Sequence, residues 1–202
     1  MPTASLIYRS AHGYELLMRA LYGRHYGARM QAVADQVPPG AGVLELCCGP
    51  GTLYERHLKQ RAKSYIGLDV NARFVEALQA RGVDARQRDL RTTVSEPLPK
   101  ADVVVMQASL YHFLPRADQL VTQMLAAARD RVVISEPVRN LSSSELPLIG
   151  TLGRRAADPG VGGHAHRFTE QTLDALMQRF DPDDAFLIPG GREKVYVLSP
   201  PA

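Results

Sequence analysis

Short apolar runs alternate with helix-like segments along most of this chain. Four runs are nearly continuous in apolar residues, which is typical of strands buried on both faces. They comprise residues 42–48, 64–70, 101–107 and 131–138. Between and beside them, apolar side chains recur at helical spacing over 53–61, 72–81 and 117–128, and residues 82–89 form a weaker strand pattern. This alternation predicts an α/β fold with a Rossmann-like, doubly wound, mostly parallel sheet.

The two ends of the chain depart from this alternation. Residues 14–37 have helical spacing interrupted by Gly23, which predicts two N-terminal helices. Residues 139–167 are rich in Gly, Pro and Ser and predict a long irregular loop. Thr169 is expected to cap a helix. Residues 184–198 then predict a β-hairpin around Pro-Gly-Gly, which brings the sheet to seven strands and makes its C-terminal addition antiparallel.

Length and composition narrow the class of protein. The chain has 202 residues, enough for one domain with a sizeable core. Its two cysteines, Cys47 and Cys48, are adjacent and cannot join distant segments. The chain shows neither an apolar run long enough to span a membrane nor a signal-peptide pattern, so we expect a cytoplasmic protein without a membrane partner.

The charge of the chain raises the question of nucleic acid. Its net charge is +3 and its basic residues are 20 Arg and 4 Lys. A nucleic-acid groove needs several basic groups on one face, but acidic residues interrupt the arginine cluster over 81–91. Scattered, solvated arginines are the simpler interpretation.

A glycine-containing turn follows the first predicted strand, and an aspartate stands at the end of each of the next two strands. The turn reads Glu45-Leu-Cys-Cys-Gly49-Pro-Gly51, where glycines let a ligand approach the backbone. Tyr54 stands where a dinucleotide-binding GxGxxG pattern needs glycine. Asp69 ends the second strand, where a carboxylate can accept both ribose hydroxyls, and Asp89 ends the third. Each acid could instead be an ordinary helix cap.

Together these residues resemble the class I S-adenosylmethionine-dependent methyltransferases. The segment ELCCGPG is similar to that family's first motif, and YIGLDVN, Asp89-Leu90 and ADVVVMQASLYHFL are similar to its later ones. The resemblance covers roughly residues 30–199. Cys47 replaces the first glycine of the motif. Because cysteine avoids positive φ, we expect the turn to begin in an ordinary backbone conformation.

The resemblance implies a binding site for S-adenosylmethionine, which becomes S-adenosylhomocysteine after transfer. It implies that Glu45 lies near the methionine amino group and that Val70 and Leu90 enclose the adenine. Asp89 would accept a hydrogen bond from the adenine amino group. Further cofactor contacts are implied along the turn, at Asp69, beyond the fourth strand and in the N-terminal helices. They comprise Cys47, Gly49, Gly51, Gln107, Ala108, Tyr22 and Tyr26. The tyrosines could equally be half-buried packing residues.

Candidate catalytic groups follow the fourth and fifth strands. His112 could act as a base, Tyr111 lies beside it, and Glu136 could assist or bind a cationic substrate. Arg139 and Arg167 could hold an anionic substrate. His164 and His166 could chelate a metal, but without a third ligand in view we predict no metal site.

We therefore predict a single-domain methyltransferase that acts on an O, N or C atom of a small molecule. Two alternatives stay open: an RNA methyltransferase that uses the arginines, and a non-catalytic module that binds S-adenosylmethionine. The sequence does not decide between a monomer and a homodimer. The predicted parts are a helical cap over 1–38, a cofactor-binding core over 39–138, a substrate loop over 139–167, and a helix with a hairpin over 168–202.

Overall fold

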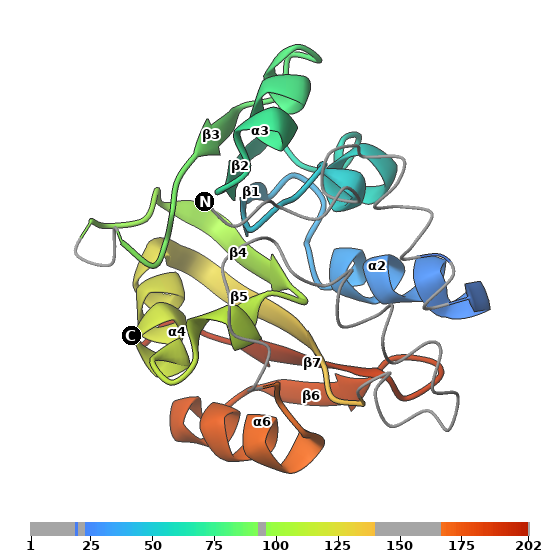
Figure 1. Ribbon diagram of the computed structural model, residues 1–202, viewed down its shortest axis with the longest axis vertical. Helices are drawn as coiled ribbons and strands as arrows, with labels where there is room; N and C mark the ends of the chain where they lie inside the picture. Colours follow the sequence, from blue (N-terminus) through green and yellow to red (C-terminus); the bar gives the residue numbers. More distant parts are fainter. Residues whose placement is uncertain (1–18, 20–22, 93–95, 140–166, 202) are drawn as a thin grey trace, which may run out of the picture.

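A seven-stranded mixed sheet forms the centre of the molecule. The computed structural model describes residue 19 and residues 23–92, 96–139 and 167–201 (Figure 1). The strand order is β3-β2-β1-β4-β5-β7-β6. Strands β1 to β5 are parallel to one another, and β7 runs antiparallel between β5 and β6. The predicted fold class, including the C-terminal hairpin, is confirmed. The strands are β1 (Gly42–Leu46), β2 (Ser64–Asp69), β3 (Ala85–Gln87), β4 (Ala101–Gln107), β5 (Ala128–Pro137), β6 (Asp184–Leu187) and β7 (Glu193–Leu198).

Helices cover both faces of this sheet. Alternate residues of β4 separate two cores: Val104 and Met106 belong to one, Val103 and Val105 to the other. The first core contains side chains of α4 (Ala117–Ala127) and α6 (Glu170–Met177). The second contains side chains of α2 (Tyr26–Asp35) and α3 (Ala72–Gln79). Burial on both faces explains why the central strands are apolar at nearly every position.

Some elements differ from their predicted form. The segment after β1 contains a π-helical turn, Tyr54–Leu58, in which the Lys59 amide donates to the Tyr54 carbonyl at 2.9 Å. Strand β5 begins directly after α4, because Ala128 already pairs with Ala101 of β4, and the pairing becomes regular from Arg131 onward. Thr169 caps α6 as predicted, with its hydroxyl accepting from the Thr172 amide at 3.2 Å.

The predicted helix before Gly23 and nearly all of the predicted loop over 139–167 lie outside the described residues. The division of the chain into cap, core and substrate loop stays a prediction. Within the described ranges, no helix has the length and apolarity needed to cross a bilayer.

Candidate functional site

The carboxyl ends of β1 and β4 meet at the point where the strand order reverses. These strands are neighbours, although β2 and β3 lie between them in the chain. In open α/β sheets, ligands bind in the crevice at such a point. The turn after β1 and the loop after β4 therefore define the candidate site.

The turn after β1 begins in a left-handed conformation, which corrects one expectation. Cys47 has φ of 55°, so the prediction of an ordinary conformation at this residue was wrong. The turn brings the Cys48 amide to the Leu68 carbonyl of β2 at 3.0 Å. That bond to the neighbouring strand accompanies the strained geometry at Cys47.

Gly49 and Gly51 serve the same turn in different ways. Both have positive φ, 55° and 76°. A Cβ at Gly51 would lie 2.4 Å from Cδ2 of Leu78 in α3, so only glycine lets the turn pack against this helix. Around Gly49, no atom of the described residues lies within 4 Å of where a Cβ would stand. The backbone is therefore open to a ligand at Gly49.

Asp69 ties the turn to the end of β2. Its two carboxylate oxygens accept from the amides of Gly49 and Asn71, each at 2.8 Å. Burial raises the pKa of Asp69, while these backbone hydrogen bonds lower it. An ionised carboxylate has about four acceptor positions, so Asp69 can still accept from a ribose.

Val70, Leu90 and Asp89 are the residues predicted to contact the adenine. Val70 is 45% exposed, which is unusual for a large apolar side chain next to a core, whereas Leu90 is buried. Both oxygens of Asp89 accept from the Arg91 guanidinium, at 3.0 and 2.8 Å. The hydrogen bonds from Arg91 lower the pKa of Asp89. An adenine amino group would share or displace this partner.

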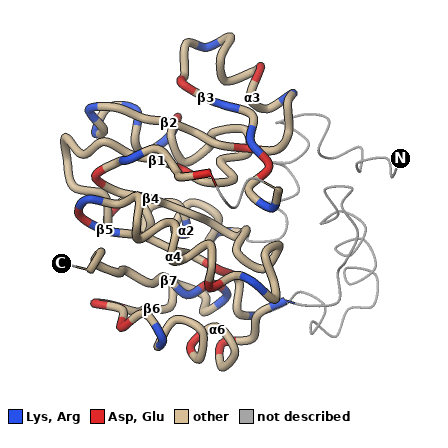
Figure 2. The backbone as a smooth tube through the Cα atoms, turned by 90° about the vertical axis from the view of Figure 1, so that its left-hand side faces the viewer, with Lys and Arg blue, Asp and Glu red and all other residues tan. Residues whose placement is uncertain are grey.

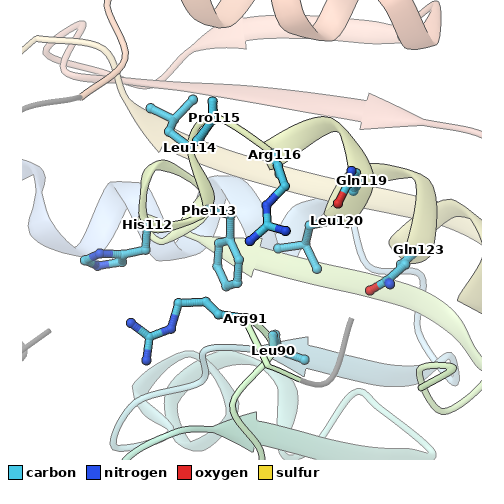
Figure 3. Close-up of a pocket in the computed structure, with 10 residues that line it drawn as sticks. All are labelled: Leu90, Arg91, His112, Phe113, Leu114, Pro115, Arg116, Gln119, Leu120 and Gln123. Atoms are coloured by element: carbon cyan, nitrogen blue, oxygen red, sulfur yellow. The ribbon is translucent and has the colours of Figure 1, made fainter. Parts of the chain in front are cut away.

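A cavity of about 190 Å³ lies beside these residues. Leu90 and Arg91 line one side, and the loop after β4 and the start of α4 line the other (Figure 3). His112 and Phe113 belong to that second side, and Figure 3 shows the Phe113 ring pointing toward Arg91.

Glu45 is buried between β1 and β2. Its Oε2 accepts from the Tyr65 hydroxyl at 2.7 Å. Burial raises the pKa of Glu45 to about 8, with a smaller contribution from the charge of Asp69. Tyr65 is a partner that the sequence analysis did not identify.

The loop after β4 begins with a second strained residue. Ala108 has φ of 52°, and its amide donates to the Ser135 carbonyl of β5 at 2.7 Å. The preceding Gln107 donates from Nε2 to the Arg29 carbonyl of α2 at 3.1 Å. Gln107 and Ala108 thus stand at the switch point, held from two sides.

Tyr111 and His112 follow in a short 3₁₀ turn, Leu110–Phe113. Their rings lie with centroids 3.9 Å apart, and the Arg167 guanidinium lies over Tyr111 at 4.6 Å from the ring centroid. His112 is exposed and Tyr111 is half-buried. Glu136, the third candidate catalytic residue, is fully buried beneath this turn, and its Oε1 accepts from the Leu110 amide at 2.6 Å.

A buried ion pair joins α2 to β7 on the other face of the sheet. Arg29 Nε lies 2.7 Å from Glu193 Oε1, and both side chains are at most 4% exposed. The second oxygen of Glu193 accepts from the Ser135 hydroxyl at 3.0 Å. The sequence analysis missed both partners. The one available signal was an arginine on the apolar face of a predicted helix.

The remaining candidates are Tyr22, Tyr26, His164 and His166. Tyr26 lies in the core beneath α2 and is 4% exposed, whereas Tyr22, His164 and His166 lie outside the described residues. Among the residues whose placement is described, no group of three His, Cys, Asp or Glu side chains could hold a metal ion.

The chain is similar in sequence to known methyltransferases. A family described as "Methyltransferase domain" matches residues 18–182. Trans-aconitate 2-methyltransferase of Mycobacterium ulcerans is 40% identical over 83 residues, which cover 40% of this chain and 30% of that protein. The corresponding protein of Mycolicibacterium gilvum is 38% identical over 109 residues, or 53% of this chain and 40% of that protein. The match thus spans less than half the length of these curated relatives.

Solved structures share the fold over nearly the whole chain. Magnesium protoporphyrin IX methyltransferase of Synechocystis, solved with bound SAH, has a TM-score of 0.62 and 19% identity, and the match covers 94% of this chain and 95% of that one. A TehB-like SAM-dependent methyltransferase of Corynebacterium glutamicum has a TM-score of 0.61 and 16% identity, with 94% and 96% covered. At these identities the likeness concerns the fold.

Proposed function

The chain belongs to the class I S-adenosylmethionine-dependent methyltransferase-domain family, and on that premise we propose that it methylates a small acceptor that carries carboxylate groups. Three features of the turn fit an S-adenosyl ligand: open space at Gly49, a carboxylate at Asp69, and the exposed side chain of Val70. The curated relatives are named for trans-aconitate, a tricarboxylate, which supports this acceptor class.

The arginines beside Tyr111 and β5 carry the acceptor part of the proposal. Arg167 lies over the Tyr111 ring, and Arg139 is exposed just after β5. Within the described part of the chain, neither guanidinium forms an ion pair with a carboxylate. Arg167 contacts Tyr111, whose amide approaches Glu136, and Arg139 follows Glu136 closely in the chain, so we expect their positive charges to serve an anionic acceptor.

Ion pairing of the other arginines with acidic residues disfavours the RNA alternative. Lys and Arg alternate with Asp and Glu along the backbone in Figure 2. Many surface arginines form ion pairs with nearby acids, which reduces the positive charge available to phosphates. Examples are Arg61–Asp35, Arg81–Glu55, Arg86–Asp84, Arg129–Asp102, Arg131–Asp130 and Arg179–Asp118.

Methyl transfer mainly requires that the acceptor atom be aligned with the methyl group and the sulfur. When bound, S-adenosylmethionine would supply a methyl group on a sulfonium sulfur; in-line attack by the acceptor atom on this methyl would break its bond to sulfur and release S-adenosylhomocysteine. A carboxylate oxygen is already ionised at neutral pH, so no side chain has to remove a proton from it. Tyr111 and His112 would then orient the acceptor and exclude water, while Gln107 and Ala108 border the reacting atoms.

Replacing Asp69 tests cofactor binding. We expect Asp69→Ala to weaken S-adenosylhomocysteine binding by about ten- to a hundredfold, since it removes hydrogen bonds to a charged acceptor. Isothermal titration calorimetry measures the affinity, and Asp84→Ala, at an exposed acid, serves as the control. The wild type is also assayed for methyl transfer to trans-aconitate. A wild-type protein that binds no S-adenosylhomocysteine would contradict the proposed function.

A further inference from the structure

One carboxyl oxygen of Glu136 has no hydrogen-bond partner among the described residues. The residue is 0% exposed, and its Oε1 accepts from the Leu110 amide. Its Oε2 is equally buried, and within the described part of the chain no group lies within hydrogen-bond distance of it. Buried polar atoms are nearly always hydrogen-bonded, so an exception next to a binding site points to a missing ligand.

The surroundings of Glu136 place this oxygen at the site. The amides of Ser109, Leu110 and Tyr111 approach the carboxyl group of Glu136 from the loop after β4, and this group interacts electrostatically with Cys47 of the cofactor turn. The carboxyl group of Glu136 therefore lies between the turn predicted to contact the cofactor and the loop that carries Tyr111. The acceptor has to bind between these two segments for the methyl group to reach it.

The charges around Glu136 favour its neutral form. Burial raises the pKa of Glu136 to about 8, and the negative charge of Glu193 on β7 adds to this, whereas the loop amides lower it. The Cys47 thiol is itself neutral, because burial raises its pKa. Lys194 pairs with Glu136 in the strand register, but its ammonium is held by Asp174 and Glu170 of α6.

We propose that Glu136 contacts the acceptor and that its Oε2 donates a hydrogen bond to an acceptor carboxylate. This inference rests on the proposed function and replaces the earlier interpretation, in which Glu136 assists His112 or binds a cationic substrate; binding a cation needs an ionised Glu136. A neutral carboxyl group can donate where an ionised one would repel an anion. Arg139 and Arg167 supply the positive charge, and Glu136 supplies a directed donor.

Glutamine at position 136 separates these interpretations. Its amide oxygen can still accept from Leu110, and its NH₂ group replaces the donor at Oε2. The probe is trans-aconitate, titrated into protein loaded with S-adenosylhomocysteine at about pH 7 and about pH 9.5, on either side of the Glu136 titration. Glu136→Leu removes the donor, and Glu76→Gln at an exposed residue of α3 is the control.

We expect wild-type protein to bind trans-aconitate about tenfold more tightly at the lower pH. Glu136→Gln should bind it at both pH values with near wild-type affinity, and Glu136→Leu should bind about tenfold more weakly at the lower pH. Groups other than Glu136 titrate equally in wild type and Glu136→Gln, so the difference between their pH profiles belongs to Glu136. Glu76→Gln should follow the wild type.

Several results would overturn the inference. These are loss of binding in Glu136→Gln, tighter wild-type binding at the higher pH, unchanged binding in Glu136→Leu, or no trans-aconitate binding in any variant. Each can occur in protein that binds S-adenosylhomocysteine normally. Failure of S-adenosylhomocysteine binding itself would instead contradict the proposed function, so the two failures are distinguishable.

Discussion

Cys47 and Ala108 share a backbone conformation that side chains with a Cβ normally avoid. Their φ angles are 55° and 52°, and they follow the adjacent strands β1 and β4. A left-handed conformation costs a non-glycine residue about 1–2 kcal/mol. Such strain persists only where neighbouring bonds enforce it, and it concentrates at functional sites. The pair therefore marks the switch point independently of the motif.

The strain at Cys47 predicts an unusual order of stabilities. We expect Cys47→Gly to be more stable than Cys47→Ala by about 1 kcal/mol, because glycine adopts this φ freely. At the exposed helical residue Ala77, glycine should instead cost about 1 kcal/mol. Urea unfolding measures all three variants. If glycine lowered stability relative to alanine by the same amount at positions 47 and 77, the backbone at Cys47 would be unstrained in solution.

For single residues, the positions of the acidic side chains could be predicted from the sequence, but their hydrogen-bond partners could not. Asp69 could be predicted because it ends an apolar run at a fixed distance from the glycines. The bonds from Arg91 to Asp89 and from Tyr65 to Glu45 could not, because they depend on side-chain rotamers and strand register. The conformation of Cys47 was mispredicted, since local preference yielded to the bond between Cys48 and β2.

Strand pairing decides what surrounds Glu45. In the register of β1 and β2, Glu45 lies opposite Gly67 and close to Tyr65. A Cβ at Gly67 would come within 2.8 Å of Cys48 Sγ and 3.0 Å of the Tyr65 hydroxyl. Glycine on β2 thus leaves the room in which this carboxyl is enclosed.

Enclosure of Glu45 should make the stability of the fold depend on pH. Its pKa is raised from 4.5 to about 8, so between these values the folded state holds a proton that the unfolded state releases. Stability therefore falls as pH rises through this window and levels off above it. Glu45→Gln should reduce the slope by up to about 1.4 kcal/mol per pH unit.

Urea unfolding between about pH 5 and pH 8 measures this slope. Glu136→Gln should reduce it similarly, because burial raises the pKa of Glu136 in the same direction. Glu76→Gln, at an exposed residue of α3, is the control and should leave the slope unchanged. An unaltered slope in Glu45→Gln would mean that Glu45 is ionised throughout the window.

Whole elements could be predicted where periodicity is strong. Strand β4 matches its predicted range of 101–107, and α4 ends one residue before its predicted end. Strand β3 is only three residues long, because just Ala85–Gln87 pairs with β2. The π-helical turn was not predicted, since its hydrogen bonding depends on how the turn enters the helix rather than on apolar spacing.

Across the whole molecule, the Arg29–Glu193 pair joins segments 164 residues apart. No local pattern encodes such a contact, because it exists only after the sheet has ordered β7 beside β5 and α2 has packed across them. The pair also reaches the site, since Gln107 donates to the Arg29 carbonyl and Ser135 donates to Glu193. A buried pair of this kind is weak evidence for stability, because desolvation offsets the attraction.

Removing one partner should therefore cost more than removing both. We expect Arg29→Met to destabilise the protein by about 3–5 kcal/mol, because it leaves Glu193 buried without its cation. Arg29→Met with Glu193→Met should restore most of this loss, since two apolar side chains of similar length need no desolvation of charge. Arg179→Met, at the exposed Arg179–Asp118 pair, should change stability by less than about 1 kcal/mol. Denaturant unfolding of the four proteins measures these differences, and a double variant that is less stable than Arg29→Met would show that the ion pair itself holds α2 on the sheet.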